Sequence, residues 1–157
     1  MRMLIAISAS VVLAATVFAQ QTAAPDMTKG AYVSAADVAA AVAKLPKNPL
    51  ASAPIFKIGP YTVNIEHRIA GAVQQSSIHD KDAELFSMVD GTATLVTGGK
   101  LVDGVHTGDN WRGTSIEGGV EQKMSKGDFM MVPAGVPHWF TNIQGTITEM
   151  SVHLPIK

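Results

Sequence analysis

The stretch GDFMMVPAGVPHWFTN, residues 127–142, decides the fold that we predict for this chain. Its centre contains Pro133, Gly135 and Pro137, residue types that favour a tight turn. Short runs of apolar and aromatic residues on both sides of the turn are typical of β-strands. The pattern predicts two successive strands, with His138 at the start of the second.

The same pattern continues outward from Ile55, as short β-rich runs separated by glycine, proline and Asn/Asp clusters. Such a sequence is typical of an antiparallel sandwich or barrel, so the predicted fold class is all-β. Alternation is clearest in residues 61–69, where an apolar face that includes Ile65 and His67 predicts a strand buried on one side. The predicted strands are 55–58, 61–69, 74–79, 84–89, 92–97, 120–124, 128–132, 137–142 and 146–154.

A glycine-rich stretch with few apolar residues, 98–119, interrupts this series and is longer than most hairpin connections. It predicts a long loop or a flexible hairpin. His106, Trp111 and Arg112 lie in it, either as a lid that clamps an anionic substrate or as surface residues without a role.

The N-terminus differs from the rest of the chain in composition. Arg2 precedes an apolar run that ends in small residues, which predicts a secretory signal peptide over residues 1–19. The run is shorter than the ~20 residues that a membrane-spanning helix needs, so we expect cleavage rather than a retained anchor. Residues 20–33 are polar and small, as in a flexible linker. The protein is therefore expected to be periplasmic or secreted.

One domain is predicted over residues 34–157, beginning with a short helix. Ser34 is a favourable N-cap, Asp37 suits the positive end of a helix, and Pro46 ends the alanine-rich segment. The chain has no cysteine, so its stability must come from packing. A net charge of -1 without clusters of Lys or Arg argues against a nucleic-acid partner.

A second polar constellation lies in GAVQQSSIHDKDAELFSMVDG, residues 71–91. Ser77 and His79 alternate along a predicted strand and should both face the barrel interior. A charged turn follows, and Glu84 begins the next strand. Two imidazoles and one carboxylate, from His79, His138 and Glu84, are expected to converge there.

The two segments resemble the two sequence motifs of the cupin superfamily. Every fixed position of the second motif is filled: Gly127, Pro133, Gly135, His138 and Asn142. The matching positions of the first motif are Gly71, His79, Glu84 and Gly91. Ser77 stands where the family usually has the first of two histidines. The resemblance implies a double-stranded β-helix, or jelly-roll, barrel that commonly forms a homodimer.

A desolvated carboxylate in an apolar barrel would cost several kcal/mol unless it is protonated or paired. A divalent cation removes that cost. We therefore predict that His79, Glu84 and His138 bind one divalent transition metal, with Fe, Mn, Ni, Co and Zn all chemically possible. Ser77 is interpreted as a residue that orients a metal-bound water. The alternatives are a weak ligand and a barrel that has lost its metal.

Other side chains are expected to line the cavity around this site. They are His67, Phe86, Met88 and Phe140. His67 would be either a fourth ligand or acid–base group, or a hydrogen-bonded core histidine. His153 alternates with the apolar Val152 and Leu154, which predicts a position outside the barrel and no role.

The resemblance implies oxygenase, isomerase or lyase chemistry on a small organic molecule, and the fold alone does not choose among them. No catalytic residue is assigned. The alternative from another class is a non-catalytic cupin that binds a small carboxylate or sugar, and a third is a structural barrel. Expected partners are a small molecule and a second copy of the chain, with no membrane contact after cleavage of the signal.

Overall fold

The computed structural model describes residues 28–58 and 61–156. The predicted signal peptide, 1–19, and most of the predicted linker, 20–33, lie outside the described residues. The part of the linker that is described, 28–33, forms neither helix nor strand. Among the described residues, no helix combines the length and the apolar character needed to cross a membrane.

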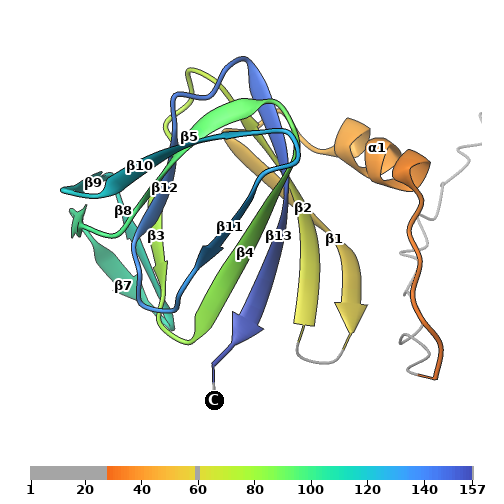
Figure 1. Cartoon of the computed structure of the whole chain (residues 1–157), viewed down its shortest axis with the longest axis horizontal. Helices are drawn as coiled ribbons and strands as arrows, with labels where there is room; N and C mark the ends of the chain where they lie inside the picture. The colour runs from red at the N-terminus through yellow and green to blue at the C-terminus, as the bar shows by residue number, and fades with distance from the viewer. Residues whose placement is uncertain (1–27, 59–60, 157) are drawn as a thin grey trace, which may run out of the picture.

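The described residues form a barrel of two large antiparallel sheets with one helix at its side (Figure 1). The elements are α1 (Ala35–Lys44), β1 (Leu50–Ile58), β2 (Tyr61–Ile69), β3 (Ser76–His79), β4 (Asp82–Asp90), β5 (Thr92–Thr97), β6 (Lys100–Val102), β7 (Val105–Thr107), β8 (Asn110–Gly113), β9 (Ser115–Glu117), β10 (Val120–Ser125), β11 (Phe129–Val132), β12 (His138–Thr141) and β13 (Thr146–Pro155).

The chain crosses repeatedly between the two sheets. One sheet has the strand order β1-β2-β13-β4-β11 and the other β10-β5-β12-β3-β8-β7. Successive strands β3, β4 and β5 therefore alternate between sheets, and β10 to β13 do the same. This is the double-stranded β-helix that the sequence predicts.

The apolar core fills the barrel between the sheets, toward the turn that joins β4 to β5. Along the inward face of β4, Glu84 is followed by the buried Phe86 and Met88. Leu95 and Phe140 reach the same cluster from the opposite sheet. Burial of a side chain of this size stabilises the fold by about 1.5–3 kcal/mol. One end of the barrel is thus closed by packing, and the Glu84 end is left for polar groups.

Predicted and observed strands agree closely for most of the barrel, and the bounds of β2 and β5 are as predicted. β1 is longer than predicted because it begins at Leu50 instead of Ile55. Pro54 does not break the strand, because β1 lies at the edge of its sheet, where the missing N–H of a proline costs no ladder bond. The register shifts between Pro54 and Phe56.

The stretch 98–119 is more ordered than the predicted loop or flexible hairpin. It folds into β6 to β9, in which β6 pairs with β9 and β7 with β8. β8 also pairs with β3, so β7 and β8 extend the six-stranded sheet, while β6 and β9 form a separate two-stranded sheet. Backbone pairing satisfies its peptide groups without much apolar burial, which is why hydropathy did not reveal the strands.

The predicted helix is confirmed. Ser34 and Asp37 form a capping box at its N-terminus. The half-buried side chains of Val38, Val42 and Leu45 form an apolar stripe along the helix, and the helix lies next to β1 and β2 (Figure 1).

The glycines and the final asparagine of the two motifs occupy backbone positions with positive φ, which side chains with a Cβ rarely adopt. They are Gly71, Gly91, Gly127, Gly135 and Asn142. Gly91, between β4 and β5, is also confined: a Cβ there would lie 2.3 Å from the carbonyl oxygen of Thr146. The motif therefore requires glycine at this position for two physical reasons.

Replacing Gly91 with alanine is expected to lower the free energy of unfolding by about 1–3 kcal/mol, from backbone strain and the clash with Thr146. Gly71→Ala is the matched control, since φ is similar and a Cβ there meets nothing within 4 Å. Chemical denaturation of both variants measures the difference. Equal losses would contradict the role of the clash.

Candidate metal centre

Three strands bring the predicted ligands together at one end of the barrel. His79 is the last residue of β3, Glu84 lies near the start of β4, and His138 begins β12. The turn before His138 is held to β3, because the Gly135 N–H donates a 2.8 Å hydrogen bond to the His79 carbonyl oxygen. All three side chains are buried.

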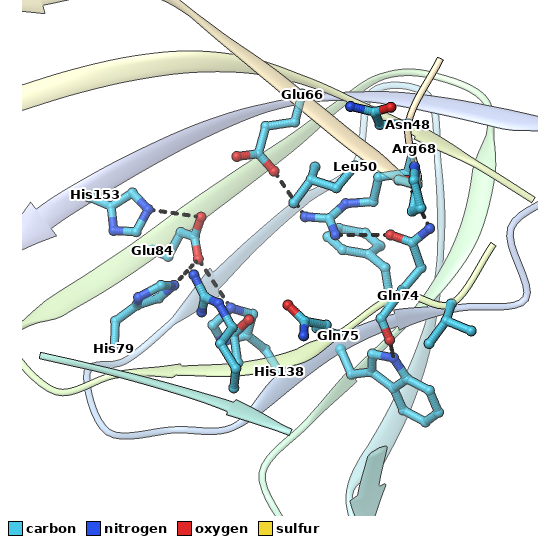
Figure 2. Close-up of a pocket in the computed structure, with 16 residues that line it drawn as sticks. Asn48, Leu50, Glu66, Arg68, Gln74, Gln75, His79, Glu84, His138 and His153 are labelled. Carbon is cyan, nitrogen blue, oxygen red and sulfur yellow. Dashed lines mark hydrogen bonds and ion pairs between the residues drawn. The ribbon is translucent and has the colours of Figure 1, made fainter. Parts of the chain in front are cut away.

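The structure brings the three predicted ligands into contact (Figure 2). Oε2 of Glu84 lies 3.2 Å from Nε2 of His79 and 3.2 Å from Nε2 of His138. Ser77 lines the adjacent cavity, on the same side of β3 as His79. The two imidazoles and one carboxylate therefore converge on one point inside the barrel.

His153, which the sequence interpretation placed outside, also faces this point. Its Nε2 lies 3.3 Å from Oε1 of Glu84, and its ring centroid is 4.6 Å from that of His79. The ligand atoms of His79, Glu84 and His153 all lie within 4.8 Å of one another. The prediction that His153 lies outside the barrel was wrong.

The error arose from the hydrophobic alternation of β13. We assumed that the apolar Val152 and Leu154 face the interior, but Glu149 and Ser151, with 0% exposure, occupy the inward face with His153. The inward face of this strand is polar because its side chains pair with charged residues of the neighbouring strands, Arg68 of β2 and Glu84 of β4. The sequence did contain a signal for this face, because polar residues occupy alternate positions along β13. The same alternation occurs in β2, at Glu66 and Arg68.

Each imidazole is held from behind by a different group. Nδ1 of His79 lies 2.5 Å from Oδ1 of Asn110, and Nδ1 of His138 lies 3.4 Å from the carbonyl oxygen of Val136. Nδ1 of His153 lies 3.6 Å from Oδ2 of Asp82. A proton on each Nδ1 leaves the Nε2 lone pair directed at Glu84, which is the usual arrangement of metal-binding histidines.

Glu84 is the electrostatic centre of the cluster. Ser151 donates a 2.6 Å hydrogen bond to Oε1, whereas Oε2 is buried without a hydrogen bond of good geometry. Burial raises the pKa of Glu84, but contacts with His138, His153 and His79 outweigh it and lower the pKa below the usual range. An ionised buried carboxylate facing imidazole nitrogens needs either protons on the rings or a cation between them. The donor set fits a divalent transition metal.

The cluster opens into a cavity of about 640 Å³. Its wall includes Ser77, Arg112, Phe140, Gln74 and Gln75. Figure 2 shows Arg68 and Gln74 on the other side of the cavity from Glu84 and the histidines, with Glu66 and Gln75 between the two groups. A small polar molecule could therefore touch the cluster and these side chains at once.

Of the four predicted lining residues, only Phe140 is part of the cavity wall. Phe86 and Met88 point inward as predicted but are packed into the core, each 1% exposed. The Phe86 ring centroid is 5.7 Å from that of His138, so the Phe86 ring packs against the site from the side of the core. His67 lies on the other face of β2, with Nδ1 3.1 Å from the Thr148 hydroxyl. The alternative of a hydrogen-bonded histidine holds for His67.

The polar face of β2 is the one that points into the barrel, which corrects the prediction that this strand buries only its apolar face. Arg68 is buried between two carboxylates: Nε is 2.5 Å from Oε1 of Glu149 and Nη2 is 2.9 Å from Oε2 of Glu66. Its guanidinium also lies over the Phe140 ring, 4.7 Å from the centroid. Ile65, on the opposite face, is buried as well. Mutual neutralisation makes a charged inward face tolerable.

His106 does not reach the cavity wall. Its ring stacks on Trp111 with centroids 4.5 Å apart, and its Nε2 lies 2.7 Å from Oδ2 of Asp80. Arg112 does line the cavity. Of the three residues considered for a lid, one is therefore placed to meet a ligand.

Glu149 should make folding stability depend on pH. Burial raises its pKa to about 7, against the attraction of Arg68. A group with a raised folded-state pKa stabilises the fold below its unfolded value, and this contribution is lost as pH rises toward 7. Glu149→Gln mimics the protonated form. Its free energy of unfolding, relative to that of the wild type, should rise by up to about 3 kcal/mol from pH 4.5 to pH 8.

Urea denaturation of the metal-free proteins at both pH values measures this difference. Glu121→Gln, at an exposed site, is the control and should follow the wild type. The same pH dependence in Glu149→Gln and wild type would mean that Glu149 does not titrate in this range.

Solved structures with the same fold are distant in sequence. The crystal structure of TT1209 from Thermus thermophilus is 18% identical, with a TM-score of 0.53 over 73% of this chain and 93% of that one. The cupin domain of Cnp3 from Schizosaccharomyces pombe is 14% identical, with a TM-score of 0.54 over 73% and 72%. Fe(II) HppE is 14% identical, with a TM-score of 0.53 over 71% and 57%. At these identities the likeness shows the fold alone.

The sequence comparison adds the family. No curated protein sequence matches this chain significantly. A sequence model of the Cupin family matches residues 55–152, which contain both motifs and the barrel around them. Because this match covers well over half of the chain, the protein belongs to the cupin family.

Proposed function

We propose that this cupin holds one divalent transition metal at His79, Glu84 and His138 and acts there on a small organic molecule. The observation that carries the proposal is the convergence of imidazole nitrogens on Oε2 of Glu84, a buried oxygen without a good hydrogen bond. A pairing of imidazole and carboxylate ligands suits Fe, Mn, Ni, Co or Zn. HppE, a structural neighbour of the same fold, contains Fe(II).

The metal would supply Lewis acidity or oxygen activation, the chemistry behind oxygenase, isomerase and lyase reactions. The chain supplies the surroundings. Phe86 and Phe140 exclude water from the side of the core, while the cavity admits a ligand from the other side. Ser77 lines this cavity next to His79, as suits a hydroxyl that orients a metal-bound water.

Arg112 favours an anionic substrate. It lies across from Ser77 in the β3–β8 pair and lines the same cavity. Its guanidinium donates a 3.3 Å hydrogen bond to the Trp111 carbonyl oxygen, and no carboxylate within the described ranges is paired with it. An exposed guanidinium beside a metal centre can bind a carboxylate or phosphate group. We therefore favour a small organic acid over a neutral sugar.

A non-catalytic cupin that binds such a molecule is the second candidate. It is favoured by Ser77, which replaces an imidazole of the family pattern and so reduces the usual ligand set. Incubation with candidate acids, followed by mass spectrometry, distinguishes the two. Saturable binding without product, whichever metal is loaded, would leave the binding function and remove the enzymatic one.

Metal analysis of the tag-free mature protein is the first test. Inductively coupled plasma mass spectrometry should find about one equivalent of a transition metal in wild type and little in His79→Ala or His138→Ala, because each loses a ligand. His106→Ala is the matched control, since its ring lies away from the cavity and should leave the metal content unchanged. A wild type that stays metal-free after reconstitution with Fe(II), Mn(II), Ni(II) and Zn(II) would remove the proposal.

We also propose that the protein acts in the cell envelope, periplasmic or secreted, and that it forms a homodimer. The proposed export rests on the apolar segment within residues 1–19. Cell fractionation and N-terminal sequencing should find a mature chain that begins at Gln20. A cytosolic product that still begins at Met1 would contradict export.

A further inference from the structure

We propose that His153 supplies the third imidazole of the metal centre, in place of the one that Ser77 lacks. This inference rests on the proposed metal-binding function, and it concerns which residues form the site. The third imidazole would then come from β13, in one sheet, instead of from position 77 of β3, in the other.

The register of the five-stranded sheet brings His153 to the site. In the pair of β13 and β4, His153 lies directly opposite Glu84. Opposed residues in an antiparallel pair project to the same face, so both side chains enter the barrel. The 3.3 Å distance between Nε2 of His153 and Oε1 of Glu84 follows from this register.

The distances within the cluster are those of ligands around one ion. With metal–ligand bonds of about 2.0–2.2 Å, donor atoms around one ion lie about 3 Å to 4.4 Å apart. Nε2 of His79 lies 3.2 Å from Oε2 of Glu84, and Nε2 of His153 lies 3.3 Å from Oε1. The ligand atoms of His79, Glu84 and His153 all lie within 4.8 Å of one another, a limit slightly wider than this range. Small side-chain adjustments are enough to bring these atoms onto a cation.

His153 also has the supporting contact that metal-binding histidines usually have. Nδ1 faces Oδ2 of Asp82 at 3.6 Å, while Nε2 faces the cluster. A carboxylate behind the ring orients it and makes Nε2 a better ligand. His79 and His138 have equivalent supports in Asn110 and the Val136 carbonyl. The three histidines are therefore built alike, although the motif pattern contains only two of them.

A simpler role for His153 is an ion pair that only orients Glu84. The two roles differ in what a histidine at position 77 would do. Ser77 lines the cavity beside His79, so an imidazole there would reach the cluster from the β3 side. An imidazole at position 77 can replace a missing metal ligand from that side. It cannot replace an ion pair between His153 and Glu84.

The experiment is a titration of the metal-free mature protein with Co(II). It measures the dissociation constant and the visible absorption spectrum of the bound ion. His153→Ala should bind Co(II) at least about 100-fold more weakly and with an altered spectrum. The double variant Ser77→His/His153→Ala should recover affinity to within about 10-fold of wild type. His79→Ala is the positive control and His106→Ala the negative one. His153→Gln replaces His153→Ala if circular dichroism shows that the alanine variant is unfolded.

The outcomes separate this inference from the proposal beneath it. A wild type that binds no Co(II) would overturn both. Co(II) binding by His153→Ala with wild-type affinity and spectrum would overturn the role of His153 and leave a site of His79, Glu84 and His138. Weaker binding with an unchanged spectrum and no recovery in the double variant would identify His153 as a positioning residue, and would also overturn its role as a ligand.

Discussion

The buried carboxylate of Glu84 is the constraint on which the polar end of this barrel depends. Burying an ionised carboxylate costs several kcal/mol unless other groups compensate for it. Here the compensation comes from both sheets: His79 and His138 from one, and His153 and Ser151 from the other. The positions of β3, β12 and β13 around β4 can be understood as the means of bringing these groups to one carboxylate.

The guanidinium of Arg68 is a second buried charge in the interior of the barrel. Arg68, held between Glu66 and Glu149, lines the cavity, and its guanidinium packs on the core residue Phe140. The barrel is therefore stabilised by apolar packing at one end, while its other end holds charged groups that satisfy one another. Such a division lets the fold tolerate an open cavity of about 640 Å³ next to a desolvated cluster.

Membership of the cupin family determines the scaffold, and the side chains inside the barrel determine its chemistry. In this chain those side chains depart from the family pattern at Ser77, on the wall that also contains Arg112. The small residue leaves room beside His79, and the guanidinium gives that room a positive charge. The same departure explains why an imidazole from another strand is valuable at this site.

The sequence by itself determined the all-β class, most strand bounds, the capped helix and the meeting of His79 and His138 at Glu84, because turn residues and motif spacing are local signals. It did not reveal the strands of residues 98–119, whose stability comes from backbone pairing rather than apolar burial. It also assigned the faces of β2 and β13 incorrectly. Alternation distinguishes two faces but cannot tell which one is inward when buried polar groups pair across strands. Only the tertiary structure, through the register that sets His153 opposite Glu84, decided that.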